Sequence, residues 1–166
     1  MDNKDNKDVA DRVVASLPYL LPLLDALPFG KFILFNYPFV ARALSPLAPL
    51  SMLYNSFPFL PFIVFLGVYS GIINNFNFSK FVRYNAMQAV LLDVLLIIPQ
   101  VILSDIFKAP SDDLGMQAYI SAYNTIFLFV AISVAYGMGS SLVGQTARIP
   151  LVAEAADSQV RDGPGF

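Results

Sequence analysis

The chain has 166 residues and a net charge of −2, with 57 % apolar and only 13 % charged residues. An ordinary soluble domain has roughly 45–50 % apolar and about 25 % charged residues, so this composition indicates an integral membrane protein. Because the sequence has no His and no Cys, we expect no metal site, no cofactor and no His-based catalytic triad.

Other function classes are also disfavoured by the pattern of charged and polar residues. No basic patch is present, so we expect no nucleic-acid partner. Catalysis by paired carboxylates or by a Ser-Lys pair survives the lack of His and Cys. However, no polar nucleophile is paired with a base in the sequence, and we therefore expect that the protein is not an enzyme.

The apolar segments predict an all-α integral membrane protein with four transmembrane helices. The expected organisation is a polar N-terminal tail (1–11), a four-helix transmembrane domain (12–144) and a polar C-terminal tail (145–166). The spans are expected at about 13–29, 57–73, 84–103 and 116–143. The first span is short, about 25 Å against a hydrocarbon core of roughly 30 Å, and Pro18 and Pro22 predict kinks in it.

Residues 32–56 are expected to be a Pro-rich connection between the first two spans. This segment is apolar, but Pro38, Pro46 and Pro49 divide it into pieces too short to cross a membrane, and Arg42 lies in its middle. The pattern favours a segment that lies in the membrane interface or re-enters the membrane part of the way. The sequence does not decide between these two arrangements.

Small residues in the second and last spans suggest faces for close helix packing. Gly67 and Gly71 lie four residues apart in the second span, and Ser133, Gly137 and Ser141 repeat every four residues in the last. Small side chains on one helical face allow another backbone to approach closely in lipid. The simpler interpretation of the glycines is their general frequency in membrane helices.

The third span carries four polar residues within one sector of roughly 140° on a helical wheel, namely Asn85, Gln88, Asp93 and Gln100. A carboxylate that faced lipid at mid-depth would cost about 2.5–3.5 kcal/mol, so Asp93 should face the bundle interior or water. The alternatives are a hydrogen bond between helices, a water-filled path, and, third, a metal site. Asp25, late in the first span, is a second candidate intramembrane acid, unless it lies at the interface.

The distribution of basic residues predicts the orientation in the membrane. Four spans place both termini on one side, and most Lys and Arg residues then lie on that side. By the positive-inside rule, the termini face the cytoplasm or its organellar equivalent.

Three blocks of the sequence carry a further signal: "ASLPYLLPLLDALPFG", "SKFVRYNAMQAVLLDVLLIIP" and "RIPLVAEAADSQV". Together they resemble the Tic twenty-kilodalton family of the chloroplast inner-envelope protein-import translocon, which has cyanobacterial relatives. They follow in the same order at comparable spacing, and the similarity covers roughly residues 9–160. Chloroplast members are usually made with a transit peptide, and the start of this chain does not resemble one. The chain is therefore expected to be a mature form, or a cyanobacterial or plastid-encoded member.

The resemblance implies a four-helix membrane protein of the chloroplast inner envelope with both termini in the stroma, or of the plasma membrane in a cyanobacterium. It implies a core, channel-associated role in the passage of precursor proteins, together with other Tic subunits and the Toc machinery of the outer envelope. No catalytic residues are known in this family.

Four packed helices leave no lumen wide enough for a polypeptide, because each is about 10 Å across. We therefore expect the chain to contribute one wall of a hydrated passage, completed by partner subunits or by further copies of itself in a homo-oligomer. In this hypothesis, the polar residues of the third span form the hydrated face. Two alternatives are a purely structural scaffold in the same complex and a small ion- or proton-coupled transporter.

Overall fold

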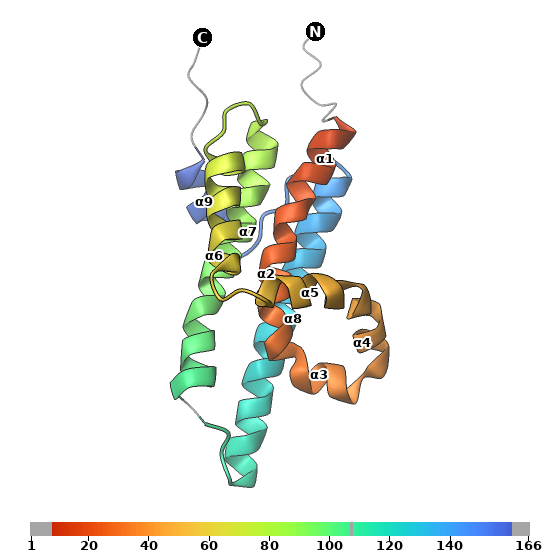
Figure 1. Cartoon of the computed structure of the whole chain (residues 1–166), viewed down its shortest axis with the longest axis vertical. Helices are drawn as coiled ribbons and strands as arrows, with labels where there is room; N and C mark the ends of the chain where they lie inside the picture. The colour runs from red at the N-terminus through yellow and green to blue at the C-terminus, as the bar shows by residue number, and fades with distance from the viewer. Residues whose placement is uncertain (1–7, 107, 161–166) are drawn as a thin grey trace.

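A computed structural model describes residues 8–106 and 108–160, and these residues form helices without any strand (Figure 1). The α-helices are α1 (Val9–Ser16), α2 (Leu20–Ala26), α3 (Lys31–Asn36), α4 (Pro38–Leu44), α5 (Ala48–Asn55), α6 (Leu60–Val68), α7 (Lys80–Gln100), α8 (Asp113–Leu142) and α9 (Ala153–Gln159). Shorter helical turns link them: η1 (Leu17–Tyr19), η2 (Leu27–Gly30), η3 (Ser45–Leu47), η4 (Tyr69–Ile73) and η5 (Val101–Ile106).

The segments from α1 to α3 form one nearly continuous helical run, Val9–Asn36, which is long and apolar enough to cross a membrane. It tightens into 3-10 turns at η1 and η2, and each turn has a proline in its first two positions. A proline lacks the N–H needed for the regular helical bond, so the run changes geometry there instead of ending. The sequence located this irregularity at Pro18 correctly, whereas Pro22 lies within α2.

The chain then makes a lateral arc through α3, α4 and α5 before it returns along α6 (Figure 1). The arc projects to one side of α2 and α8, and none of the residues of α4 is buried. The segments Pro38–Asn55 and Leu60–Ile73 bend by 102° at the break between them. At a rise of 1.5 Å per residue, Leu60–Ile73 is only about 21 Å long and is too short to cross the hydrocarbon alone.

Helices α7 and α8 are the longest in the structure, and both begin with a side-chain cap. The Oγ atom of Ser79 accepts a bond from the N–H of Val82, and the Oδ2 atom of Asp112 accepts one from the N–H of Gly115 at 2.8 Å. The 30 residues of α8 extend about 45 Å, so this helix projects beyond a 30 Å hydrocarbon core.

Within the described residues, three helical segments satisfy the length and hydropathy of a membrane span: Val9–Asn36, Lys80–Leu103 and Asp113–Leu142. The bent pair of Pro38–Asn55 and Leu60–Ile73 makes a fourth only if both parts are taken together. The prediction of an all-helical membrane protein is therefore confirmed, and the second predicted span, 57–73, is part of a bent element. The start of α1 and the end of α8 lie at the same end of the molecule (Figure 1).

The largest part of the apolar core lies between α1–η2, α7 and α8. Its buried side chains include Tyr19, Phe29, Leu92, Phe127 and Val130. Dispersion contacts of this kind hold membrane helices together, because apolar burial gains little when the surroundings are already apolar.

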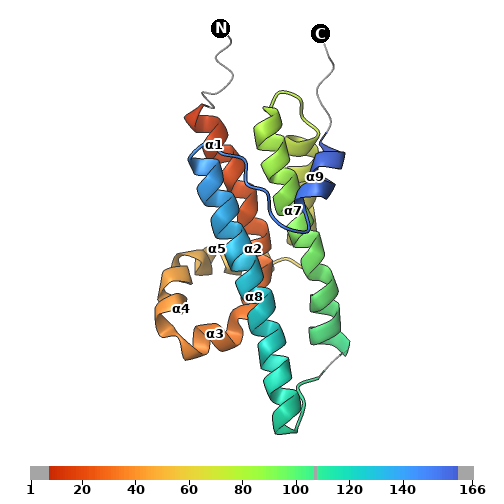
Figure 2. The same cartoon turned by 180° about the vertical axis from the view of Figure 1, so that it is seen from behind.

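Residues 145–152, here called the C-terminal strap, enter the bundle after α8 ends. Gly144 takes a left-handed conformation (φ 79°), where glycine has no Cβ to clash, and the chain reverses there. The strap then runs between α7 and α8 and leads into α9, which lies against α7 (Figure 2). The sequence analysis expected a polar tail from residue 145; instead Ala147 and Ile149 are fully buried, and residues 161–166 lie outside the described part of the chain.

Candidate functional site

A buried polar network joins the upper half of α7 to η1 and α8. The Tyr19 hydroxyl donates a hydrogen bond to Asn85 Oδ1 at 3.1 Å, and Ser141 Oγ lies 3.1 Å from the same oxygen. The Nδ2 atom of Asn85 donates to the carbonyl of Phe81 at 2.9 Å. Asn85 and Ser141 are fully buried, so the network replaces the water that these polar groups would otherwise need.

Gln88 uses its whole amide group to hold the C-terminal strap. Its Nε2 atom donates to the carbonyl of Ala147 at 2.8 Å, and its Oε1 atom accepts from the N–H of Ile149 at 2.9 Å. Nε2 also lies 3.5 Å from the Tyr19 hydroxyl, which links this pairing to the network around Asn85. The two main-chain groups belong to residues two positions apart, so the Gln88 side chain binds the strap as an adjacent β-strand would.

The sequence analysis offered two main interpretations of the polar residues on the third span, a hydrated face and hydrogen bonds between helices, and the four residues differ in their environments. Asn85 and Gln88 are fully buried and bonded within the chain, whereas Gln100, at the end of α7, is exposed. Asp93 is partly buried on a different flank of the helix. The polar residues that remain available to water or to a partner are therefore Asp93 and Gln100, in the half of α7 remote from the termini.

Asp93 and Asp25 face the same cavity between α2, α6 and α7, and together they are called the acidic pair. Both side chains line this cavity, which has a volume of about 290 Å³. The Tyr54 hydroxyl donates to Asp25 Oδ2 at 3.1 Å. By contrast, Asp93 Oδ1 is buried and has no hydrogen-bond partner among the described residues.

The acidic pair lies inside the hydrocarbon if the ends of α7 mark the membrane surfaces. At 1.5 Å per residue, Asp93 is about 10 Å from Gln100, and Asp25 is about 9 Å from Lys31. Lys31 lies over the ring of Tyr123, with its Nζ atom 4.2 Å from the ring centre, in an aromatic cluster typical of a membrane interface. Two carboxyl groups at this depth are costly unless water or a polar partner reaches them.

The second feature near the acidic pair is the non-helical turn between α5 and α6. Residues 56–59 are not helical, and they connect Tyr54, which bonds Asp25, to Pro61, which lines the cavity of the acidic pair. The side chains of Phe57 and Phe59 are 64 % and 74 % exposed. Non-helical backbone is tolerated at membrane depth only where it is covered by protein or lines a water-filled cavity.

The two small-residue faces found in the sequence have different environments. A Cβ atom on Gly137 would lie 2.5 Å from the ring of Tyr19, and Ser133 is buried on the same face as Gly137 and Ser141. A Cβ atom on Gly67 or on Gly71 would meet nothing within 4 Å. The face on α8 therefore packs within the chain, whereas the glycines of the second predicted span are free for another molecule.

An ion pair outside the membrane spans fastens the strap to α9. The Nη2 atom of Arg148 donates to Asp157 Oδ2 at 2.7 Å, and its Nη1 atom donates to the Tyr84 hydroxyl at 3.4 Å. The hydrogen bond from Arg148 lowers the pKa of the Asp157 carboxyl, and the bond to Asp157 raises the pKa of Arg148. Both side chains are about half exposed, so solvent weakens this pair.

Chemically, the arrangement offers acidic and main-chain polar groups. Within residues 8–106 and 108–160, no three metal-ligating side chains come together. Tyr19, Tyr54 and Arg148 were missed by the sequence analysis. Tyr19 and Tyr54 are separated in sequence from their partners by 66 and 29 residues, so only the folded chain shows their roles.

Comparison with known proteins adds an independent finding. Residues 4–156 match the family model described as "Chloroplast import apparatus Tic20-like". The chain is 42 % identical to Protein TIC 20-v, chloroplastic, of Arabidopsis thaliana, over 94 % of this chain and 74 % of that protein. It is 38 % identical to Protein TIC 20-II, chloroplastic, of the same plant, over 90 % and 72 %. It is 35 % identical to a Tic20 family protein of Synechocystis sp., over 97 % and 99 %.

Proposed function

Because the chain belongs to the Tic20-like family of the chloroplast import apparatus, we propose that it is a core, channel-associated subunit of a protein-import translocon. It resides in the chloroplast inner envelope, or in the plasma membrane of a cyanobacterium, and both termini face the stroma or cytoplasm. Its partners are other Tic subunits, the Toc machinery and precursor proteins in transit.

In this proposal, the acidic pair and the turn 56–59 form one wall of the hydrated passage. An extended polypeptide in transit exposes unpaired main-chain groups, each of which costs several kcal/mol in hydrocarbon. The wall therefore has to bring water or polar groups to mid-depth. The acidic pair beside a non-helical turn is the observation that carries this proposal, because both are unfavourable in contact with lipid.

The remaining walls come from partner subunits or from further copies of this chain. The described helices pack around a filled core, with Tyr19, Phe127 and Leu92 completely buried at its centre. The passage therefore runs along the outside of the bundle, on the flank where α2, α6 and α7 border the cavity of the acidic pair.

A photo-crosslinking residue at position 94 tests this proposal. Val94 lines the cavity beside Asp93, and the native acids stay in place when it is replaced. A precursor fused to a folded domain is arrested midway across membranes that contain the intact complex. We expect crosslinks from position 94 to the precursor. The matched control is position 132, because Ile132 is 67 % exposed at mid-depth on α8 and is expected to contact lipid.

The scaffold alternative is favoured by one observation, the exposed and uncontacted Gly67 and Gly71. These glycines allow a helix of another subunit to approach closely. If position 94 crosslinks only to neighbouring subunits and never to the arrested precursor, the protein is a scaffold and the passage lies elsewhere.

A further inference from the structure

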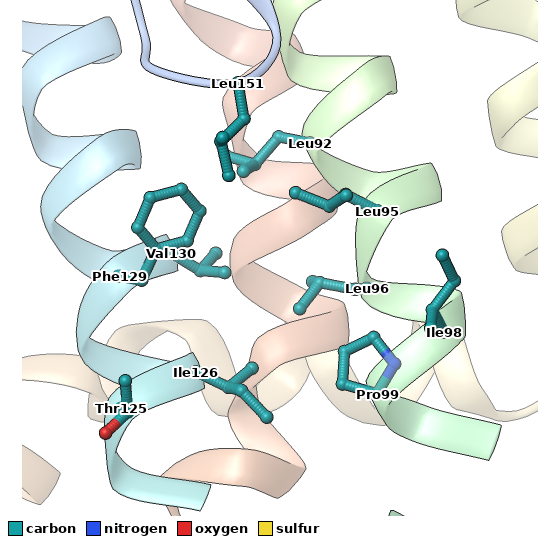
Figure 3. A pocket seen from close by; sticks show the side chains of 10 residues that line it. All are labelled: Leu92, Leu95, Leu96, Ile98, Pro99, Thr125, Ile126, Phe129, Val130 and Leu151. Atoms are coloured by element: carbon teal, nitrogen blue, oxygen red, sulfur yellow. The ribbon is translucent and has the colours of Figure 1, made fainter. Parts of the chain in front are cut away.

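The interface between α7 and α8, here called the seam, is covered by the C-terminal strap at the end nearer the chain termini. Below the strap the seam continues as an apolar cavity of about 290 Å³, lined from both helices (Figure 3). Leu92 and Leu96 line it from α7, Phe129 and Val130 from α8, and Leu151 of the strap lies at its upper end (Figure 3). This cavity is separate from the one at the acidic pair, which lies on another flank of α7.

The inner contacts of the strap combine main-chain pairing with buried side chains, because Ala147 and Ile149 are fully buried and Ile149 belongs to the main core. Gln88 pairs with the carbonyl of Ala147 and the N–H of Ile149, and every extended polypeptide offers the same two groups at this spacing. Two residues beyond Ile149, Leu151 presents an apolar side chain to the seam (Figure 3). The groove therefore accepts an extended backbone that carries small or apolar side chains at its buried positions and is followed by an apolar side chain.

Two features of the strap, its ion pair and Leu151, favour release. Its ion pair, Arg148 with Asp157, is half exposed, and such pairs contribute little to stability in water. Leu151 has a left-handed backbone (φ 74°), which is unfavourable for a residue with a Cβ atom. Its side chain is 77 % exposed although it borders an apolar cavity. Leu151 therefore contributes little to holding the strap in place.

From these observations we propose that the strap is a displaceable seal, whose place at Gln88 is taken by an extended segment of a passing polypeptide. In the resting protein, the strap occupies the place that this segment would take. This inference rests on the proposed function, because it requires a polypeptide in transit. On α7, Gln88 lies closer than Asp93 to the end beside the chain termini, which the proposed function places in the stroma or cytoplasm, so the segment at Gln88 is one that has already passed the depth of the acidic pair.

A cysteine at position 147 or 149 reports on the seal, because the native chain has no Cys. Ala147 and Ile149 are fully buried residues of the strap, so either cysteine should react slowly with a water-soluble maleimide in resting membranes. We expect at least a tenfold faster reaction when a precursor is arrested in the complex. Ser158→Cys, on the exposed side of α9, serves as the control that reacts in both states.

The two proposals fail in different ways in this experiment. If the precursor crosslinks to position 94 but the cysteines at 147 and 149 stay protected, the strap is a permanent part of the fold and the inference is overturned. If the cysteines become reactive without a crosslink at position 94, the strap opens as inferred and the acidic pair does not line the passage. If neither changes, both proposals are overturned.

Discussion

Replacement of Gln88 by Leu removes both hydrogen bonds that hold the strap and leaves its main-chain groups buried. Each buried polar group without a partner costs about 1–3 kcal/mol. Hydrogen bonds between membrane helices average only about 0.6 kcal/mol, because lost partners are often replaced. The groups here belong to Ala147 and Ile149, which are fully buried and beyond the reach of water unless the strap moves. We therefore expect Gln88→Leu to destabilise the strap by about 2–4 kcal/mol.

Amide hydrogen exchange of residues 145–156 measures this effect directly. A loss of about 2–4 kcal/mol corresponds to roughly 30- to 1,000-fold faster exchange, at 1.4 kcal/mol for each factor of ten. The matched control is Gln100→Leu, the same chemical change on the same helix at an exposed position. It should leave exchange of the strap unchanged within about twofold. If Gln88→Leu also stays within twofold of the unchanged protein, the pairing at Gln88 does not hold the strap.

Two further predictions concern the packing face of α8 and the ion pair on the strap. Gly137→Ala places a methyl group 2.5 Å from the buried ring of Tyr19, so we expect the free energy of unfolding to fall by about 1–3 kcal/mol. Gly67→Ala has open space around it and should change the free energy of unfolding by no more than about 0.5 kcal/mol. Thermal and denaturant unfolding followed by circular dichroism compares the two, and equal losses would contradict the packing assigned to α8. For the ion pair, Arg148 lowers the pKa of Asp157. The stability that the pair gives to the strap is therefore complete above the ordinary carboxyl range near pH 4. It is lost as pH falls through the lower pKa of Asp157 in the folded state. Hydrogen exchange of the strap should therefore speed up at acid pH relative to Asp157→Asn at the same pH, and a constant ratio between the two proteins would refute this role.

The helical class and the strong spans could be predicted because hydropathy and length are properties of contiguous sequence. The segments Val9–Asn36, Lys80–Leu103 and Asp113–Leu142 each contain one of the apolar runs identified from the sequence. The bend of 102° before α6 was not predicted. Pro58 and Pro61 mark a break in the sequence, but the direction of a bent segment depends on the helices that it contacts.

The site was predicted less completely than the fold, because a helical wheel gives angles but not neighbours. Asn85, Gln88, Asp93 and Gln100 share one broad sector, yet the strap covers Gln88 and Asp25 faces Asp93. The strap mixes polar and apolar residues in sequence, and its place in the bundle depends on a side chain about sixty residues away. No local pattern reports such a contact.

Water access at the turn 56–59 tests the central claim most directly. A single cysteine replaces Phe59, which is 74 % exposed in the turn that leads to Pro61 of the cavity, in membranes with the intact complex. The control is Ile132→Cys on the lipid-facing side of α8. If the turn lines a hydrated passage, a water-soluble maleimide will label position 59 at a rate close to that of exposed Ser158→Cys and will leave position 132 unlabelled. If positions 59 and 132 are equally unreactive, this flank of the protein is not a wall of the passage.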